Sequence, residues 1–221
     1  MSQAPAEPSD LAAALDALPL FPLPQVALFP GAVLPLHVFE PRYKAMIRDC
    51  LETHRALAIV QIVDADDLDE HGHPRIAKIA GAGLIVDHAE LPEGRFNILV
   101  RGRARVRLDE LPFVPPYRTA KATILPTEDT GVPERDVTAL LANAQAFVSL
   151  VREGDRDFDF RMPRGVPPGF LADVCAHHLI IDAGERQMIL ETLDLAQRVQ
   201  RVTEILALQR LTLGKKGHEL N

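Results

Sequence analysis

The chain has 221 residues, 47% of them hydrophobic, which is enough for one large domain or two small ones with a buried core. Its 31 acidic and 24 basic residues give a formal net charge of −7, which works against general attraction to nucleic acid phosphates or anionic lipid. The composition excludes a wholly disordered chain and disfavours a nucleic acid partner.

The first segment and the cysteines predict a cytoplasmic protein with an irregular tail. Residues 1–9 show no periodicity, and Asp10 could cap a short helix that runs through Leu18. The sequence does not open on a cationic, apolar leader. Cys50 and Cys175 lie at apolar positions of helical patterns, so we expect two buried thiols in the reducing cytoplasm.

An uncharged run from Ala17 to Phe39 is long enough to cross a membrane. Prolines interrupt this run, each removes a backbone donor, and irregular backbone is not tolerated against lipid. We therefore expect no membrane partner, and short strands at Val26–Phe29 and Val33–Phe39 around a Pro30-Gly31 turn. The prolines are Pro19, Pro22, Pro24, Pro30 and Pro35.

The periodicity changes at Pro41, a residue suited to the first position of a helix. Apolar residues then recur at helical spacing, which predicts an amphipathic helix of about three turns that closes over the strands. These residues are Tyr43, Met46, Ile47, Cys50 and Leu51.

The string LPLFPLPQVALFPGAVLPLHVFEPRYKAMI closely resembles the start of the amino-terminal, substrate-binding domain of Lon proteases, a domain that also occurs as a free-standing protein. The resemblance continues through LPEGRFNILVRGRARVRL (Leu91–Leu108) and GERQMILETLDLAQRVQRVTEIL (Gly184–Leu206). It implies an α+β fold, with a β-rich, PUA-like pseudo-barrel followed by an α-helical bundle. It also implies non-catalytic recognition of unfolded polypeptide or of a specific protein partner, and it supplies no catalytic residues.

Two further runs, Ala56–Val63 and Lys78–Leu91, are rich in β-branched residues and predict strands. The acidic segment 64–74 between them, DADDLDEHGHP, invites a metal site. The calcium-loop pattern fails, because Leu68 occupies a ligand position and no Glu follows at the required spacing. We interpret this segment as a solvated loop and expect no metal.

A turn at Pro92–Gly94 precedes a long strand over Phe96–Leu108, which Gly102 could divide in two. Four arginines alternate along it, and a period of two places them on one face. This face could bind RNA, but we favour a solvated sheet face paired with carboxylates, since it lacks interleaved aromatics. A strand over Tyr117–Leu125 would complete about six strands. The arginines are Arg101, Arg103, Arg105 and Arg107.

The pattern becomes helical after a loop-like stretch at residues 126–133. A helix is predicted from the region of Val137 to Gly154, and another over Phe170–Ile181. Asp182 and Asp194 have the spacing of capping boxes for two final helices, the second running to about Leu213. The predicted parts are a tail and short helix (1–18), a β-rich subdomain (19–125), a linker (126–133) and a helical subdomain (134–221).

The motifs of the usual catalytic machineries are absent from the sequence. It contains no phosphate-binding loop of the Gly-x4-Gly-Lys-Ser/Thr type, and its serines are Ser2, Ser9 and Ser149, none within a nucleophile-elbow pattern. We therefore expect neither an enzyme nor a cofactor. A hydrolase with an unrecognised site, using a thiol and a base brought close by folding, is a second alternative after RNA binding.

A module that binds non-native chains must expose apolar surface. Two places could supply it, the proline-rich run and the long connection 155–169, in which apolar residues alternate with charges. The oligomeric state is open, and a homodimer is compatible with the sequence. The candidate partner-binding residues are Phe21, Leu23, Phe158, Phe160 and Met162.

Overall fold

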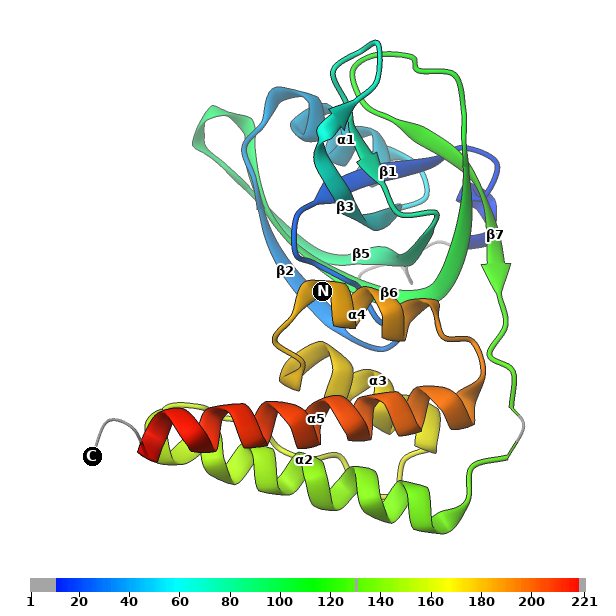
Figure 1. Cartoon of the computed structure of the whole chain (residues 1–221). Helices are drawn as coiled ribbons and strands as arrows, with labels where there is room; N and C mark the ends of the chain where they lie inside the picture. The colour runs from blue at the N-terminus through cyan, green and yellow to red at the C-terminus, as the bar shows by residue number, and fades with distance from the viewer. Residues whose placement is uncertain (1–10, 130, 219–221) are drawn as a thin grey trace, which may run out of the picture. The chain divides into compact units, whose positions relative to one another are not determined.

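The computed structural model describes residues 11–129 and 131–218. The chain forms two compact units, the first ending at Leu125 and the second beginning at Pro126. The first is built mainly of strands and the second of helices, as the α+β expectation stated (Figure 1). The expected tail at residues 1–9 and the cap at Asp10 lie outside the described residues.

Over residues 11–125, the first unit combines seven strands with one α-helix and two short 3-10 helices. In chain order these are η1 (Leu11–Ala14), β1 (Leu18–Leu23), β2 (Val33–Val38), α1 (Pro41–Glu52), β3 (Ala56–Leu68), β4 (Pro74–Ile76), β5 (Ile79–Leu91), η2 (Pro92–Gly94), β6 (Arg95–Glu110) and β7 (Thr119–Leu125). The strand order is β1-β7-β6-β5-β3-β4, with β2 paired to β6.

The sheet closes on itself because β1 has partners on both edges. It pairs antiparallel with β7 at Leu18 and parallel with β3 from Leu20 to Leu23. β6 is long enough to pair with β2 along its first half and with β7 along its second half, while β5 follows its other edge. The result is a barrel of β1, β7, β6, β5 and β3.

Alternate residues of the strands fill the barrel, as a period of two requires. On β3 these are Ala56, Ala58 and Val60, and small residues at this position let the facing strands approach. Leu11 and Ala14 of η1 belong to the same core. The predicted boundary after residue 18 therefore separates η1 from the core to which it contributes.

The proline-rich loop between β1 and β2 packs against glycines of β5 and β6. A Cβ atom on Gly81 would lie 1.8 Å from Leu28 O, and one on Gly102 would lie 2.1 Å from Phe29 O. Gly31 N donates to Gly102 O, and Gly102 N donates to Ala32 O, both at 2.9 Å. Glycine at these strand positions thus lets the loop backbone lie directly on the barrel.

Three local predictions were wrong. Val26–Phe29 is irregular instead of a strand, because its backbone follows Pro24 and a left-handed Gln25 (φ 61°). The helix expected through Leu18 ends at Ala14, since Leu18 already pairs with β7. Asp64–Leu68 extends β3 and pairs with β4, so the solvated loop is a short turn after Leu68.

The described residues of the second unit form a bundle of four α-helices. They are α2 (Glu134–Gly154), α3 (Pro168–Leu179), α4 (Ala183–Glu191) and α5 (Leu195–His218). The predicted caps are confirmed, since Asp182 Oδ1 accepts from Glu185 N and Asp194 Oδ1 accepts from Gln197 N, both at 2.8 Å. The predicted linker is bound to this unit, because Leu195 N donates to Glu128 O at 2.9 Å.

A buried ion pair joins α3 to α5. Arg198 Nε lies 3.3 Å from Asp173 Oδ1, and the two side chains are 1% and 6% exposed. Arg198 also donates to Thr192 O at 2.9 Å. None of the described helices has the length and apolar character needed to cross a membrane.

We expect Gly81→Ala to lower the free energy of unfolding by about 1–3 kcal/mol or more, because the new methyl group would meet Leu28 O. Gly154→Ala is the control, since a Cβ atom there meets nothing within 4 Å. Urea unfolding followed by circular dichroism measures both. A Gly81→Ala variant as stable as wild type would show that the loop does not need the close approach.

We expect Asp173→Ala to lower the free energy of unfolding by about 3–5 kcal/mol, since it removes the carboxylate beside the buried Arg198 charge. Asp159→Ala removes the carboxylate of an exposed pair with Arg161, 3.6 Å apart, and should cost about 0–1 kcal/mol. Chemical denaturation of the two variants gives the comparison. Equally small decreases in the free energy of unfolding of the two variants would show that the buried pair is no more important for stability than the exposed one.

Candidate functional site

Helix α2 carries two apolar stripes. Leu140, Ala144 and Phe147 are buried in the bundle. Val137 and Leu141, one helical turn apart, are only half-buried and belong to a second stripe beside the first. An apolar surface of this width needs more cover than the bundle supplies.

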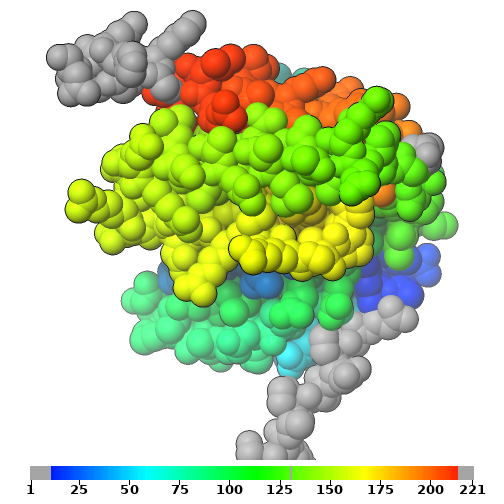
Figure 2. All heavy atoms as spheres, turned by 90° about the horizontal axis from the view of Figure 1, so that it is seen from below, coloured from blue at the N-terminus to red at the C-terminus, as the bar shows by residue number. Residues whose placement is uncertain are grey.

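The connection between α2 and α3 lies opposite this second stripe, and a groove of about 1050 Å³ runs between them. Figure 2 shows the two segments side by side on one face of the helical unit. The lining residues are Val137, Leu141, Gln145, Val148, Ser149 and Arg152 of α2, residues 160–166 of the connection, and Leu171 of α3. This groove is our candidate site.

Three contacts hold the connection in place. Arg152 donates from Nε to Phe158 O at 3.3 Å and from a terminal nitrogen to Phe160 O at 2.8 Å. The Phe160 ring is 8% exposed and lies 5.4 Å from the His178 ring. Met162 Sδ lies 4.0 Å from Cys175 Sγ of α3. The connection is therefore held in place by side chains of α2 and α3.

The structure corrects the expected exposure of several candidate residues. Phe21 is 4% exposed, and its ring lies 4.4 Å from the ring of Tyr43 on α1. Phe160 is also buried, while Leu23, Phe158 and Met162 are half-buried. Phe21 points out of the barrel, where α1 covers it, so the proline-rich run does not offer this ring to a partner. Of the candidates, only Phe160 and Met162 line the groove.

The expected face of four arginines is also wrong. Arg101, Arg103 and Arg107 are exposed, whereas Arg105 is 3% exposed, with its guanidinium 5.9 Å from the centre of the Phe29 ring. The loop that packs on the barrel covers this position. The basic surface of β6 is therefore interrupted in its middle.

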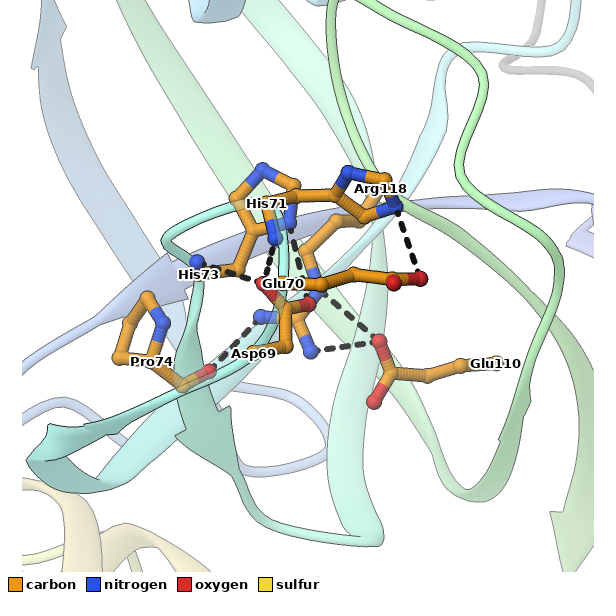
Figure 3. A network of polar contacts seen from close by, with 7 residues as sticks. All are labelled: Asp69, Glu70, His71, His73, Pro74, Glu110 and Arg118. Carbon is orange, nitrogen blue, oxygen red and sulfur yellow. Dashed lines mark hydrogen bonds and ion pairs between the residues drawn. The ribbon is translucent and has the colours of Figure 1, made fainter.

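The acidic and histidine-rich turn between β3 and β4 forms a polar network (Figure 3). Asp69 accepts hydrogen bonds from the backbone of His73 and His71, and these bonds lower the pKa of its carboxyl group. The rings of His71 and His73 lie 5.0 and 4.5 Å from that of Phe113. In residues 11–129 and 131–218, no three His, Cys, Asp or Glu side chains are grouped to hold a metal ion.

Both thiols are buried, as predicted, and both are free. Burial raises the pKa of Cys50 and of Cys175 to about 12. Cys50 Sγ donates to Ala56 O at 3.4 Å. A thiol in this state is protonated at neutral pH and is a poor nucleophile.

A second hollow, of about 660 Å³, lies on the barrel beside β2. Its polar lining residues His37, Asp87, His88 and Asn97 are exposed, and His37 Nδ1 lies 2.7 Å from Asn97 Oδ1. This hollow therefore combines exposed polar side chains with apolar ones such as Leu36 and Ile98.

Sequence reasoning identified the connection 155–169 but missed its partner surface on α2. The signal was present, because Val137, Leu141 and Val148 widen the apolar face of this helix beyond one stripe. Arg152 was missed as well, since a hydrogen bond from a side chain to the carbonyls of a loop leaves no periodic pattern.

Comparison with protein families gives one match, over residues 17–207, to the ATP-dependent protease La (LON) substrate-binding domain. The Lon protease of Roseiflexus castenholzii is 30% identical over 211 residues, which cover 92% of this chain and 26% of that protein. Lon protease 2 of Myxococcus xanthus is 31% identical over 198 residues, which cover 87% of this chain and 24% of that protein. The chain thus spans about a quarter of these relatives.

Two solved structures share the fold. The Lon N-terminal domain protein from Xanthomonas campestris has a TM-score of 0.61 at 23% identity, covering 84% of this chain and 96% of that one. The N-terminal domain of the Mycobacterium avium complex Lon protease has a TM-score of 0.64 at 17% identity, and the match covers 87% of this chain and 98% of that one.

We expect iodoacetamide at pH 8 to modify neither cysteine of the native protein and both cysteines in urea. The unfolded thiols ionise near their ordinary pKa of about 8.5, whereas the folded ones ionise near 12. The protonated thiols therefore contribute full stability below about pH 8.5, and this contribution is lost as the pH rises toward 12. Mass spectrometry counts the modified residues. Rapid labelling of one native thiol would support the hydrolase alternative.

Proposed function

The chain belongs to the family of the ATP-dependent protease La (LON) substrate-binding domain, and on that basis we propose that it recognises polypeptide segments through the groove between α2 and residues 160–166. The single observation that carries this proposal is the half-buried apolar stripe of α2 beside an ordered, irregular segment. Concave, mostly apolar surfaces with a few polar groups are typical of binding sites.

The floor of the groove supports binding of side chains with no fixed partner shape. Val137 and Leu141 offer aliphatic surface, and Met162 offers a flexible thioether that can adapt to different side chains. Such a surface suits segments of non-native chains as well as one defined partner.

We propose recognition without catalysis. Ser149 of α2 lines the groove, but the lining residues include no His, Lys, Asp or Glu that could activate it. The thiols Cys50 and Cys175 are buried and protonated. We propose a cytoplasmic location, where buried free thiols of this kind are common.

RNA binding has less support than polypeptide recognition. The burial of Arg105 leaves three exposed arginines on β6 in place of a continuous basic stripe. Single-stranded RNA is usually held by aromatic stacking together with basic residues. No aromatic side chain alternates with these arginines on the strand.

We expect Met162→Ser to weaken binding of a reduced and carboxymethylated, permanently unfolded protein about fivefold, because one apolar contact of the groove is lost. Met188→Ser is the matched control, since Met188 is 49% exposed on α4 and does not line the groove. Fluorescence anisotropy of the labelled unfolded protein measures affinity, and a thermal melt checks the fold. Equal effects of the two changes, or no binding by wild type, would contradict the proposal.

A further inference from the structure

The charge of the groove wall differs from that of the chain as a whole. The lining residues include three arginines and no acidic side chain. The whole chain has 31 acidic and 24 basic residues. An apolar floor with a cationic wall complements a ligand that is both apolar and anionic.

Two of the three arginines are available to a ligand. Arg152 is engaged, since it donates to the carbonyl oxygens of the connection. The Arg161 side chain is 89% exposed, and its Nε lies 3.6 Å from Asp159 Oδ1 in a weak surface pair. Arg164 is exposed, and the structure records no ion pair for it within the described residues. A guanidinium group can bind a carboxylate through two parallel hydrogen bonds.

The length of the groove limits the ligand. Along α2 the lining runs from Val137 to Arg152, which at 1.5 Å per residue is about 22 Å. An extended peptide rises about 3.3 Å per residue, so about six or seven residues fit. A small organic anion would fill only part of this length.

We propose that the groove takes a short peptide segment with two or three apolar side chains flanked by Asp or Glu. The apolar side chains lie on the floor formed by α2 and Met162, and the carboxylates pair with Arg161 and Arg164. This inference rests on the proposed function and names the class of polypeptide that the groove prefers. Basic segments are disfavoured, because no carboxylate lines the groove and Arg164 would present like charge.

Nucleic acid fits the groove less well than an acidic peptide. The only aromatic ring among the lining residues is Phe160, and it is 8% exposed. Bases therefore find no exposed ring on which to stack. Two available arginines also offer few phosphate contacts compared with the many that support nucleic acid binding.

The test uses the full chain and three labelled eight-residue peptides with leucine at the same positions and Glu, Gln or Lys between them. Fluorescence anisotropy at low and high salt gives the affinities. We expect the Glu peptide to bind wild type about twofold to thirtyfold more tightly than the Gln peptide, and the Lys peptide to bind most weakly. The difference should shrink as salt screens the exposed charges.

The double variant Arg161→Glu, Arg164→Glu should lose the preference for the Glu peptide and favour the Lys peptide. Arg201→Glu is the matched control, because Arg201 is exposed on α5 and does not line the groove. It should leave the order of the peptides unchanged. Thermal melts show whether either variant loses its fold.

The outcomes separate this inference from the proposed function. Equal binding of the three peptides by wild type would overturn the inference. The proposed function would still stand if the carboxymethylated, unfolded test protein binds wild type more tightly than Met162→Ser. If neither the peptides nor the unfolded protein bind, both fail. Displacement of the Glu peptide by an RNA oligonucleotide at matching concentration would overturn the inference in favour of phosphate recognition.

Discussion

The first unit depends on the close approach of one loop to the barrel. The carbonyl groups of Leu28 and Phe29 occupy the space that side chains would fill at Gly81 and Gly102. Hydrogen bonds between this loop and Gly102 fix where β2 begins and thus its register on β6. α1 follows β2 after a short connection and covers Phe21. The proline-rich run is therefore packed against the barrel and α1, which explains why it offers little surface to a partner.

The groove of the second unit has a different origin. Its irregular wall contains Pro163, whose fixed φ angle and missing donor oppose helix and sheet, and it ends at Pro167, the cap that precedes α3. Arg152 satisfies two of the carbonyl groups that regular structure would have paired. The connection can therefore stand beside α2 without covering it, and the second apolar stripe stays accessible. The hydrogen bonds from Arg152 thus both order the connection and leave the second apolar stripe of α2 exposed.

Local patterns in the sequence identified most elements, because period and capping are short-range properties. The start of α1 at Pro41 and the caps of α4 and α5 at Asp182 and Asp194 belong to this class. What failed depended on contacts between distant residues. The burial of Arg105 requires Phe29, and the pairing of Leu18 requires β7. The groove needed both the stripe on α2 and the position of the connection; each had a signal in the sequence, but their meeting in space did not.

The size of the groove sets the kind of recognition that it can support. Two or three apolar side chains on the floor contribute about 1–3 kcal/mol each at most when fully buried, and binding must offset the ordering of a flexible peptide. The exposed pairs with Arg161 and Arg164 add little each, since water and salt screen them. Under the proposed function, the affinity of one segment would therefore be modest and its release fast. A folded protein seldom exposes several apolar side chains in one extended segment, whereas a non-native chain exposes many. Repeated weak capture of such segments would select for the unfolded state without a fixed sequence, and the arginines would bias that selection toward acidic neighbours.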